Sequence, residues 1–194
     1  MDTHAFDIIV IGAGIAGATV AAHLSPDHRV ALIEAEEAAG YHTTGRSAAI
    51  WILNYGPPDV RVLTGASREF FTNPPPGFAD APILNRRAVV FLAPPDQAGR
   101  LQIMLNEGTG LRETSVAEIQ KLVPALRSDY AVGAAIEDDA FDMDVAQLHQ
   151  GFLRQMRAAG GVLALRSRTG RIEWQNGNGR SKPRAAVYSR HPSS

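Results

Sequence analysis

The chain has 194 residues, of which 45% are hydrophobic and 20% charged, and its formal net charge is -1. This is the composition of a globular protein, and it excludes a strongly basic surface for nucleic acid or anionic lipid. The absence of cysteine excludes disulfides, thiolate catalysis and Cys-ligated zinc. The apolar run near the start is too short for a spanning helix, so we expect a cytoplasmic protein without an integral membrane segment.

The first forty residues follow the pattern of a dinucleotide-binding β-α-β unit. A short apolar run, IIVI (8–11), is typical of a strand buried on both faces. An alanine-rich stretch that ends at Ser25 predicts a helix, and a second apolar run, VALI (30–33), predicts the next strand. The turn between the first strand and the helix carries a G-x-G-x-x-G motif, made of Gly12, Gly14 and Gly17.

Each glycine of this motif has a physical role in a dinucleotide site. Gly12 permits a tight turn after the strand, Gly14 lets the backbone approach a pyrophosphate, and Gly17 allows the helix to pack close to the sheet. The helix begins near Ile15 and Ala16, where free N–H groups and the positive end of the helix dipole favour phosphate.

Glu34 ends the second apolar run, where a carboxylate can accept hydrogen bonds from a ribose diol. The alternative is a β-α-β unit whose glycines only form a tight turn and whose Glu34 is a solvated strand end. The glycine motif by itself does not choose between NAD(P) and FAD.

The segment after Glu34, AEEAAGYHTTGRSAA (35–49), resembles the second motif of the FAD-dependent D-amino acid oxidase superfamily. The resemblance continues through residues 54–78 and 141–165 and covers residues 6 to about 175. Within the superfamily the chain is most similar to the N-terminal half of bacterial D-arginine dehydrogenase-type proteins. Classical NAD enzymes need no such loop after the acid, so the loop favours FAD over NAD(P).

This resemblance implies FAD bound without a covalent link. By this resemblance, the pyrophosphate would be contacted by Gly12, Gly14, Ile15, Ala16 and Gly17. The adenosine ribose would be contacted by Glu34 and Ala35. The diphosphate and the flavin edge would be contacted by Gly45, Arg46, Ser47, Ala48 and Ala49. An arginine can make charge-assisted hydrogen bonds to a phosphate, and small residues let backbone amides reach a cofactor. The alternative is an ordinary surface loop with a solvated arginine.

The resemblance also implies the reaction: oxidation of the C–N bond of an amine or D-amino acid, with hydride transfer to the flavin and hydrolysis of the imine to a 2-oxo acid. Tyr55 is the candidate catalytic residue, on a loop that closes over the substrate; alternatively, Tyr55-Gly56-Pro57 is a structural turn. Arginine-preferring members carry a histidine and a glutamate where Ile50 and Val89 stand, so we expect a substrate less polar than D-arginine. The electron acceptor is left open.

The expected fold class is α/β: a Rossmann-like FAD-binding lobe with an inserted α+β substrate lobe, truncated at the C-terminus. The expected FAD-binding parts are 1–56 and 141–176, and the partial substrate lobe is 57–140. Within that lobe, an apolar stripe from Val60 to Phe71 predicts an amphipathic helix, and VGAAIEDDAF (132–141) predicts a strand and a turn.

The end of the chain, 177–194, is basic and lacks an amphipathic period, so we expect it to be disordered. Superfamily members are about twice as long, which suggests a truncated product with a frameshift near 176–178. A non-catalytic FAD-binding fragment therefore remains an alternative to an enzyme, and an NAD(P)-dependent dehydrogenase is a further one.

Overall fold

The computed structural model describes residues 4–170 and 187–188. The chain divides into two compact units, which are described separately below. The first unit contains residues 1–47, 75–81 and 145–194, and the second contains residues 48–74 and 82–144.

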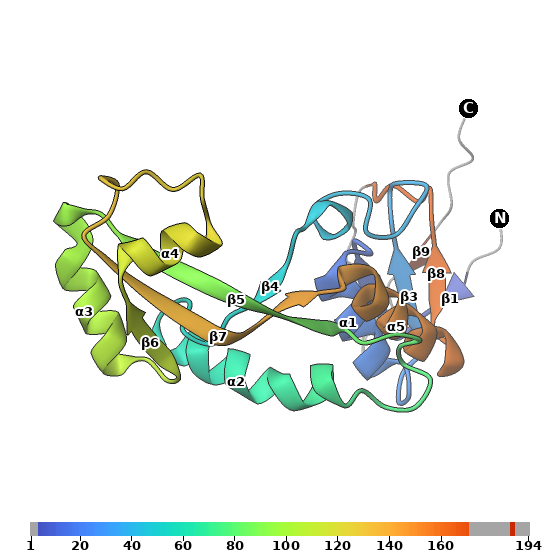
Figure 1. Ribbon diagram of the computed structural model, residues 1–194. Coiled ribbons are helices and arrows are strands. Elements are labelled where there is room, and N and C mark those ends of the chain that lie inside the picture. Colours follow the sequence, from blue (N-terminus) through green and yellow to red (C-terminus); the bar gives the residue numbers. More distant parts are fainter. Residues whose placement is uncertain (1–3, 171–186, 189–194) are drawn as a thin grey trace, which may run out of the picture. The chain divides into compact units, whose positions relative to one another are not determined.

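A three-stranded parallel sheet forms the centre of the first unit (Figure 1). Its strands, in spatial order, are β2 (Ile8–Ile11), β3 (Val30–Ile33) and β8 (Val162–Ala164). Helix α1 (Ile15–Leu24) connects β2 to β3, so the predicted β-α-β unit is confirmed. All four residues of β3 are buried, as expected for the central strand of a parallel sheet.

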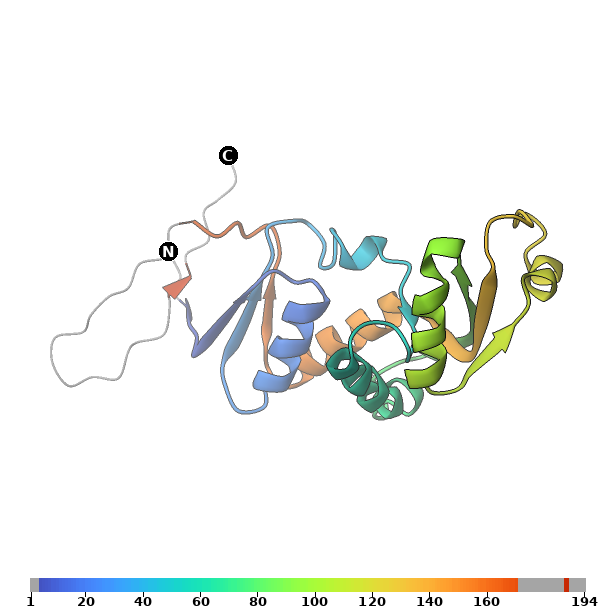
Figure 2. The same ribbon diagram turned by 90° about the vertical axis from the view of Figure 1, so that its left-hand side faces the viewer.

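Helix α5 (Val145–Ala158) packs against α1 beside this sheet. Leu148, Phe152 and Met156, which recur at helical spacing in the sequence, form its buried apolar face. The Phe152 ring also contacts Phe78 in an edge-to-face arrangement, with ring centroids 5.0 Å apart. Figure 2 shows α1 (blue) and α5 (orange) near the parallel sheet from a second direction.

Two short strands join the chain ends of the first unit. Strand β1 (His4–Ala5) pairs antiparallel with β9 (Val187–Tyr188). The segment expected to be disordered, 177–194, therefore contains a paired strand at residues 187–188. The rest of that expectation, and the proposed frameshift region at 176–178, lie outside the described residues.

An antiparallel sheet forms the second unit, with long strand β7 (Gly133–Met143) at its centre. It pairs with strands β4 (Ile50–Trp51), β5 (Leu84–Ala93) and β6 (Leu111–Thr114). The other elements of this unit are α2 (Pro58–Thr72), η2 (Pro95–Gln97), α3 (Ala98–Glu107) and α4 (Val116–Leu122).

Side chains along β7 point alternately to the two faces of the sheet, and each face carries a small hydrophobic core. Ala135 packs with Leu101 of α3 on one face, and Ala134 and Ile136 pack with Ile119 of α4 on the other. Successive side chains of a strand point to opposite faces, so α3 and α4 cover opposite faces of the sheet. The expected α/β fold with an inserted α+β part is confirmed.

One local expectation is wrong, and another holds in part. The strand predicted to end in a turn continues as β7 to Met143, and Asp138 and Asp139 lie where its register against β5 shifts, at a β-bulge or irregularity. The amphipathic helix predicted from Val60 to Phe71 is present as α2, but its apolar stripe is not buried throughout, since Leu63 is 71% exposed.

Helix α2 faces the sheet with the Thr64 carbonyl and the Arg68 side chain. The indole N–H of Trp51 donates to the Thr64 carbonyl at 3.0 Å. The Arg68 guanidinium lies 5.3 Å from the ring centroids of both Trp51 and Phe141, and it pairs with Asp139. Cation–π contacts and an indole hydrogen bond therefore fix the packing side of α2.

Among the described residues, no helix combines the length and the apolar character needed to cross a membrane.

Candidate functional site

The glycine turn between β2 and α1 is shaped by close backbone contacts. Gly12 has φ +95°, and its N–H donates to the Ile33 carbonyl at 2.8 Å. A Cβ at Gly17 would lie 1.9 Å from the Gly12 carbonyl oxygen, closer than atoms can approach. The turn therefore needs glycine at both positions, one for the backbone angle and the other for helix–strand packing.

The carboxylate of Glu34 closes the turn from the neighbouring strand. Its Oε2 accepts from the N–H of Ala13 at 2.8 Å, and its Oε1 accepts from the N–H of Glu36 at 3.1 Å. Partial burial acts to raise the pKa of Glu34, but the backbone N–H bonds outweigh it and hold the pKa below its usual value. Glu34 is thus an ionised acceptor at the end of β3, next to the glycine turn.

The start of α1 is contacted by a hydroxyl from the following loop. The N–H of Ile15 donates to Oγ1 of Thr44 at 2.9 Å. A Cβ at Gly14 would lie 3.1 Å from the same oxygen. Thr44 was not among the predicted site residues; its signal is a hydroxyl beside a glycine in the loop after the acid.

His149 reaches the same turn from α5. Its Nε2 lies 2.9 Å from the Ala13 carbonyl oxygen, and because a carbonyl can only accept, this nitrogen carries the proton. The imidazole is 4% exposed. It also packs against Gly40, where a Cβ would lie 3.0 Å from the ring. The sequence signal for His149 was its position beside Leu148 on the buried face of α5.

The loop expected to follow the cofactor starts in the first unit. Gly45 packs on Gly40, with its N–H donating to that carbonyl at 2.7 Å. Arg46 is exposed and its guanidinium lies 5.5 Å from the ring centroid of Tyr41. The Ser47 hydroxyl donates to the Thr43 carbonyl at 2.7 Å. The Arg46 charge is therefore at the surface beside an aromatic ring.

The remaining predicted cofactor residues differ in their surroundings. Ala16 and Ala35 are exposed in the first unit. Ala48 and Ala49 belong to the second unit, where the Ala49 carbonyl accepts from the Met143 N–H at 2.9 Å. Twelve residues were predicted to bind the cofactor. Among them, the residues of the glycine turn and Glu34 lie close together in the first unit.

These residues fit the phosphates and ribose of a dinucleotide. The first N–H groups of a helix have no partner within the helix, and they carry its positive dipole end. The turn in front of α1 lacks bulky side chains, since Gly12, Ala13 and Gly14 form it. Glu34 supplies the negative acceptor at the next strand end that a ribose diol needs.

The second unit contains a small apolar pocket of about 260 Å³ between α2 and β4. It is lined by Ile50, Trp51, Ile52, Tyr55, Val60, Thr64, Ser67, Phe71 and Met143. Tyr55, the predicted catalytic residue, is 70% exposed at this pocket. Apart from the indole and hydroxyl groups, the lining is aliphatic or aromatic, and Ile50 is part of it.

Comparison with known families decides the identity of this fold. The model of the family described as "DAO: FAD dependent oxidoreductase" matches residues 7–187. The chain belongs to this family. The predicted superfamily is therefore confirmed, whereas the particular similarity to D-arginine dehydrogenases stays a prediction.

Solved structures of similar fold come from several oxidoreductases. Glycine oxidase from Geobacillus kaustophilus is 20% identical, with a TM-score of 0.72, 88% of this chain covered and 49% of that chain. FAD-bound L-alpha-glycerophosphate oxidase from Mycoplasma pneumoniae is 15% identical, with a TM-score of 0.73 and coverages of 93% and 51%. L-proline dehydrogenase from P. horikoshii is 19% identical, with a TM-score of 0.67 and coverages of 87% and 46%.

These similarities establish a shared fold. The chain spans about half the length of the solved structures it matches. Since the family is FAD-dependent, the match favours FAD over the NAD(P) alternative.

Proposed function

We propose that this chain is the FAD-binding part of an oxidoreductase that oxidises the C–N bond of an amine or amino acid. The observation that carries the proposal is the glycine turn before α1, closed by Glu34 and Thr44 in a chain of the FAD-dependent family. The names of two structural neighbours, glycine oxidase and L-proline dehydrogenase, describe action on amino acids, which supports this substrate class.

The first unit would hold the cofactor. The amides at the start of α1 other than that of Ile15, which donates to Thr44, would bind the pyrophosphate, and Glu34 would accept hydrogen bonds from the adenosine ribose. Ala35 would lie beside that ribose, while Gly45, Arg46 and Ser47 would follow the diphosphate and the flavin edge. When bound, FAD supplies the electron acceptor for oxidation of the C–N bond.

The second unit would supply part of the substrate site. Tyr55 would offer its hydroxyl to the substrate, and the pocket beside it would receive an apolar group. Ile50 lines this pocket, and it carries no group that could stabilise a guanidinium. A cation placed there without a partner would be costly, so the proposed substrate is less polar than D-arginine.

The test begins with purification of the full chain and its absorbance spectrum. A flavin spectrum that persists through gel filtration supports the cofactor assignment, and a colourless folded protein that does not take up added FAD contradicts it. Anaerobic addition of D-leucine, D-phenylalanine or D-arginine then reports on the reaction through bleaching of the flavin. We expect faster bleaching by the apolar amino acids, and a preference for D-arginine would contradict the substrate proposal.

A second candidate function is FAD binding without turnover. It is compatible with the contacts at the glycine turn, which concern the cofactor alone. Retention of flavin together with no bleaching by any amine would support this second function over the first.

A further inference from the structure

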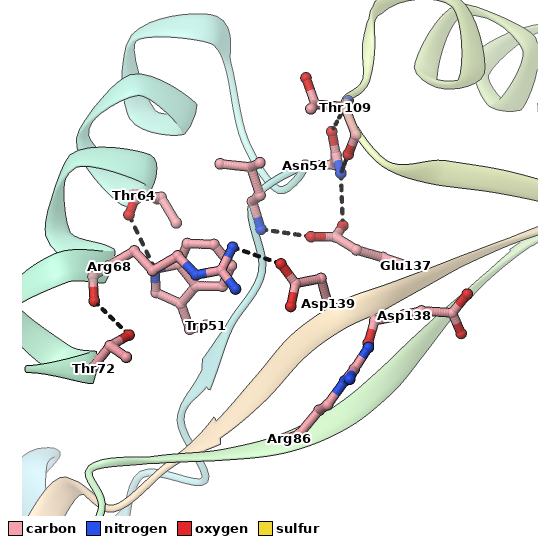
Figure 3. A network of polar contacts seen from close by, with 11 residues as sticks. Trp51, Asn54, Thr64, Arg68, Thr72, Arg86, Thr109, Glu137, Asp138 and Asp139 are labelled. Atoms are coloured by element: carbon pink, nitrogen blue, oxygen red, sulfur yellow. Dashed lines mark hydrogen bonds and ion pairs between the residues drawn. The ribbon is translucent and has the colours of Figure 1, made fainter.

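Two buried polar side chains, Asn54 and Glu137, form a hydrogen-bonded pair in the second unit (Figure 3). Each residue is only 2% exposed. Oε2 of Glu137 accepts from Nδ2 of Asn54 at 2.9 Å, and Oε1 accepts from the N–H of Leu53 at 2.8 Å. One carboxylate on β7 therefore holds two consecutive residues of the loop that follows β4.

Asn54 also joins this loop to the turn between α3 and β6. Its Nδ2 donates to the Thr109 carbonyl at 2.9 Å, and its Oδ1 accepts from the Thr109 N–H at 2.9 Å. A Cβ at Gly108 would lie 2.9 Å from Oδ1 of Asn54. The amide of Asn54 thus uses its oxygen and its amino group, and the backbone packs closely around it.

Within the described residues, Glu137 has no ionic partner. Its carboxylate accepts hydrogen bonds from the backbone N–H of Leu53 and from the side-chain amide of Asn54. A buried carboxylate without a cation is expensive, and an apolar side chain of similar size would avoid that penalty. A carboxylate does, however, accept two hydrogen bonds in one plane, which an apolar residue cannot. The specific effect of Glu137 is therefore to fix the Leu53–Asn54 backbone.

The next residue in this loop is Tyr55, the exposed residue at the apolar pocket. Gly56 follows with φ +90°, and its carbonyl accepts from Nε of Arg61 at 2.8 Å. The backbone is thus held before Tyr55 by Asn54 and Glu137 and after it by Arg61. The Tyr55 ring itself stays exposed between these two fixed points.

From this arrangement we propose that Asn54 and Glu137 are positioning residues, which hold the loop that presents Tyr55 to the substrate. The inference rests on the proposed function, since Tyr55 contacts substrate only if the chain acts on one. Holding the backbone in advance reduces the entropy lost when substrate orders the loop, so the network would raise catalytic efficiency without touching the substrate.

The first experiment measures hydrogen exchange of the peptide that spans Leu53 to Gly56 in the full chain. Glu137→Gln keeps the shape but replaces one acceptor by an amino group, so one of the two donors loses its partner. We expect exchange of this peptide to become about 5- to 30-fold faster, from the loss of about one hydrogen bond. Asp138→Asn is the matched control, because Asp138 is the exposed neighbouring carboxylate on the same strand.

Asn54→Ala disrupts the same network from the loop side and should accelerate the same peptide. If one of the two variants fails to fold, the other carries the comparison. Unchanged exchange in a folded variant would overturn the proposal, and so would failure of both variants to fold, since the network would then be required for the fold itself.

The second experiment separates positioning from general stability. In flavin reduction by an amine, Glu137→Gln should lower kcat/KM about 5- to 20-fold, while the flavin content stays unchanged. In a Tyr55→Phe background, the same substitution should have less than about a twofold effect, because the positioned hydroxyl is already absent. Additive effects of the two substitutions would overturn the link to Tyr55.

Failure of this inference differs from failure of the proposed function. If the unmodified chain binds FAD but no amine reduces it, the proposed reaction is wrong, and the exchange experiment alone decides whether Asn54 and Glu137 hold the loop. If amines reduce the flavin and Glu137→Gln changes neither exchange nor kcat/KM, the positioning role is wrong while the proposed function stands.

Discussion

His149 donates a hydrogen bond from Nε2 to the carbonyl oxygen of Ala13, joining the middle of α5 to the turn that precedes α1. Both residues are buried, and the N–H of Ala13 is bound at the same time by Glu34. The two backbone polar groups of Ala13 are therefore satisfied by side chains from two other elements. These two contacts fix the peptide planes of the glycine turn.

Replacement of His149 by leucine should destabilise the first unit by about 1–3 kcal/mol, because the buried Ala13 carbonyl loses its donor. The measurement is the free energy of unfolding in urea, followed by far-UV circular dichroism. His23→Leu is the control, since His23 is exposed and bonds a carbonyl of its own helix at Thr19. Equal losses in the two variants would contradict a specific role for His149.

Two glycine-to-alanine substitutions should have opposite effects. At Gly17 a new Cβ would overlap the Gly12 carbonyl oxygen, so α1 must move away from β2, with a loss of about 1–3 kcal/mol. At Gly99, near the start of α3, a new methyl group would meet no atom within 4 Å beyond the adjacent residues and the helix's own backbone, and alanine should stabilise the protein by about 0.4–1 kcal/mol.

Thermal unfolding of both variants tests this pair. A Gly17→Ala protein with an unchanged melting temperature would contradict close packing of α1 on the strand. A destabilised Gly99→Ala protein would contradict the open surroundings of that residue.

The first unit was largely predictable because its signals are local. A continuous apolar run, three spaced glycines and a second run specify β2, the turn, α1 and β3 within a short segment. The apolar face of α5 was equally visible at helical spacing. In these elements, local propensity and burial favour the same structure, so tertiary packing does not override the prediction.

The contacts that sequence reasoning missed are those between distant segments. Nothing in the sequence pairs His149 with Ala13, and Thr44 contacts α1 only because the loop folds back onto it. The period of α2 revealed its apolar stripe but not the side from which the sheet approaches, which Trp51 and Arg68 determine. The spacing of apolar residues along the sequence does not reveal which partner a polar side chain will bind, nor which face of a helix will pack on the sheet.

Thr44→Val should weaken the start of α1. The substitution preserves the shape of the side chain but leaves the N–H of Ile15 without its acceptor, at a loss of about 1 kcal/mol. The unfolding free energy in the absence of FAD measures this effect. Thr43→Val is the matched control, because Thr43 is exposed and contributes its backbone carbonyl, not its side chain, to the bond with Ser47. Equal stability of the two variants would contradict the assigned role of Thr44.

The carboxylate of Glu34 should make the stability of the first unit depend on pH in the acid range. Its pKa is lower in the folded chain than usual, as backbone N–H bonds from Ala13 and Glu36 outweigh the opposing effect of burial. Its contribution is therefore fully present above the unfolded-state pKa and is lost as the pH falls through the folded-state pKa.

Glu34→Gln should consequently be less stable than the unmodified chain at pH 7, by about 1–2 kcal/mol for a charge-assisted hydrogen bond to the backbone. The difference between the two proteins should narrow as the pH falls from about 5 to 3, because protonation removes the same charge from the unmodified chain. Urea unfolding at several pH values measures it. Glu37→Gln is the control, since Glu37 is exposed and pairs with Arg166 at the surface. A gap between the Glu34→Gln and unmodified proteins that stays constant from pH 7 to pH 3 would show that shape, and not charge, is what Glu34 contributes to the turn.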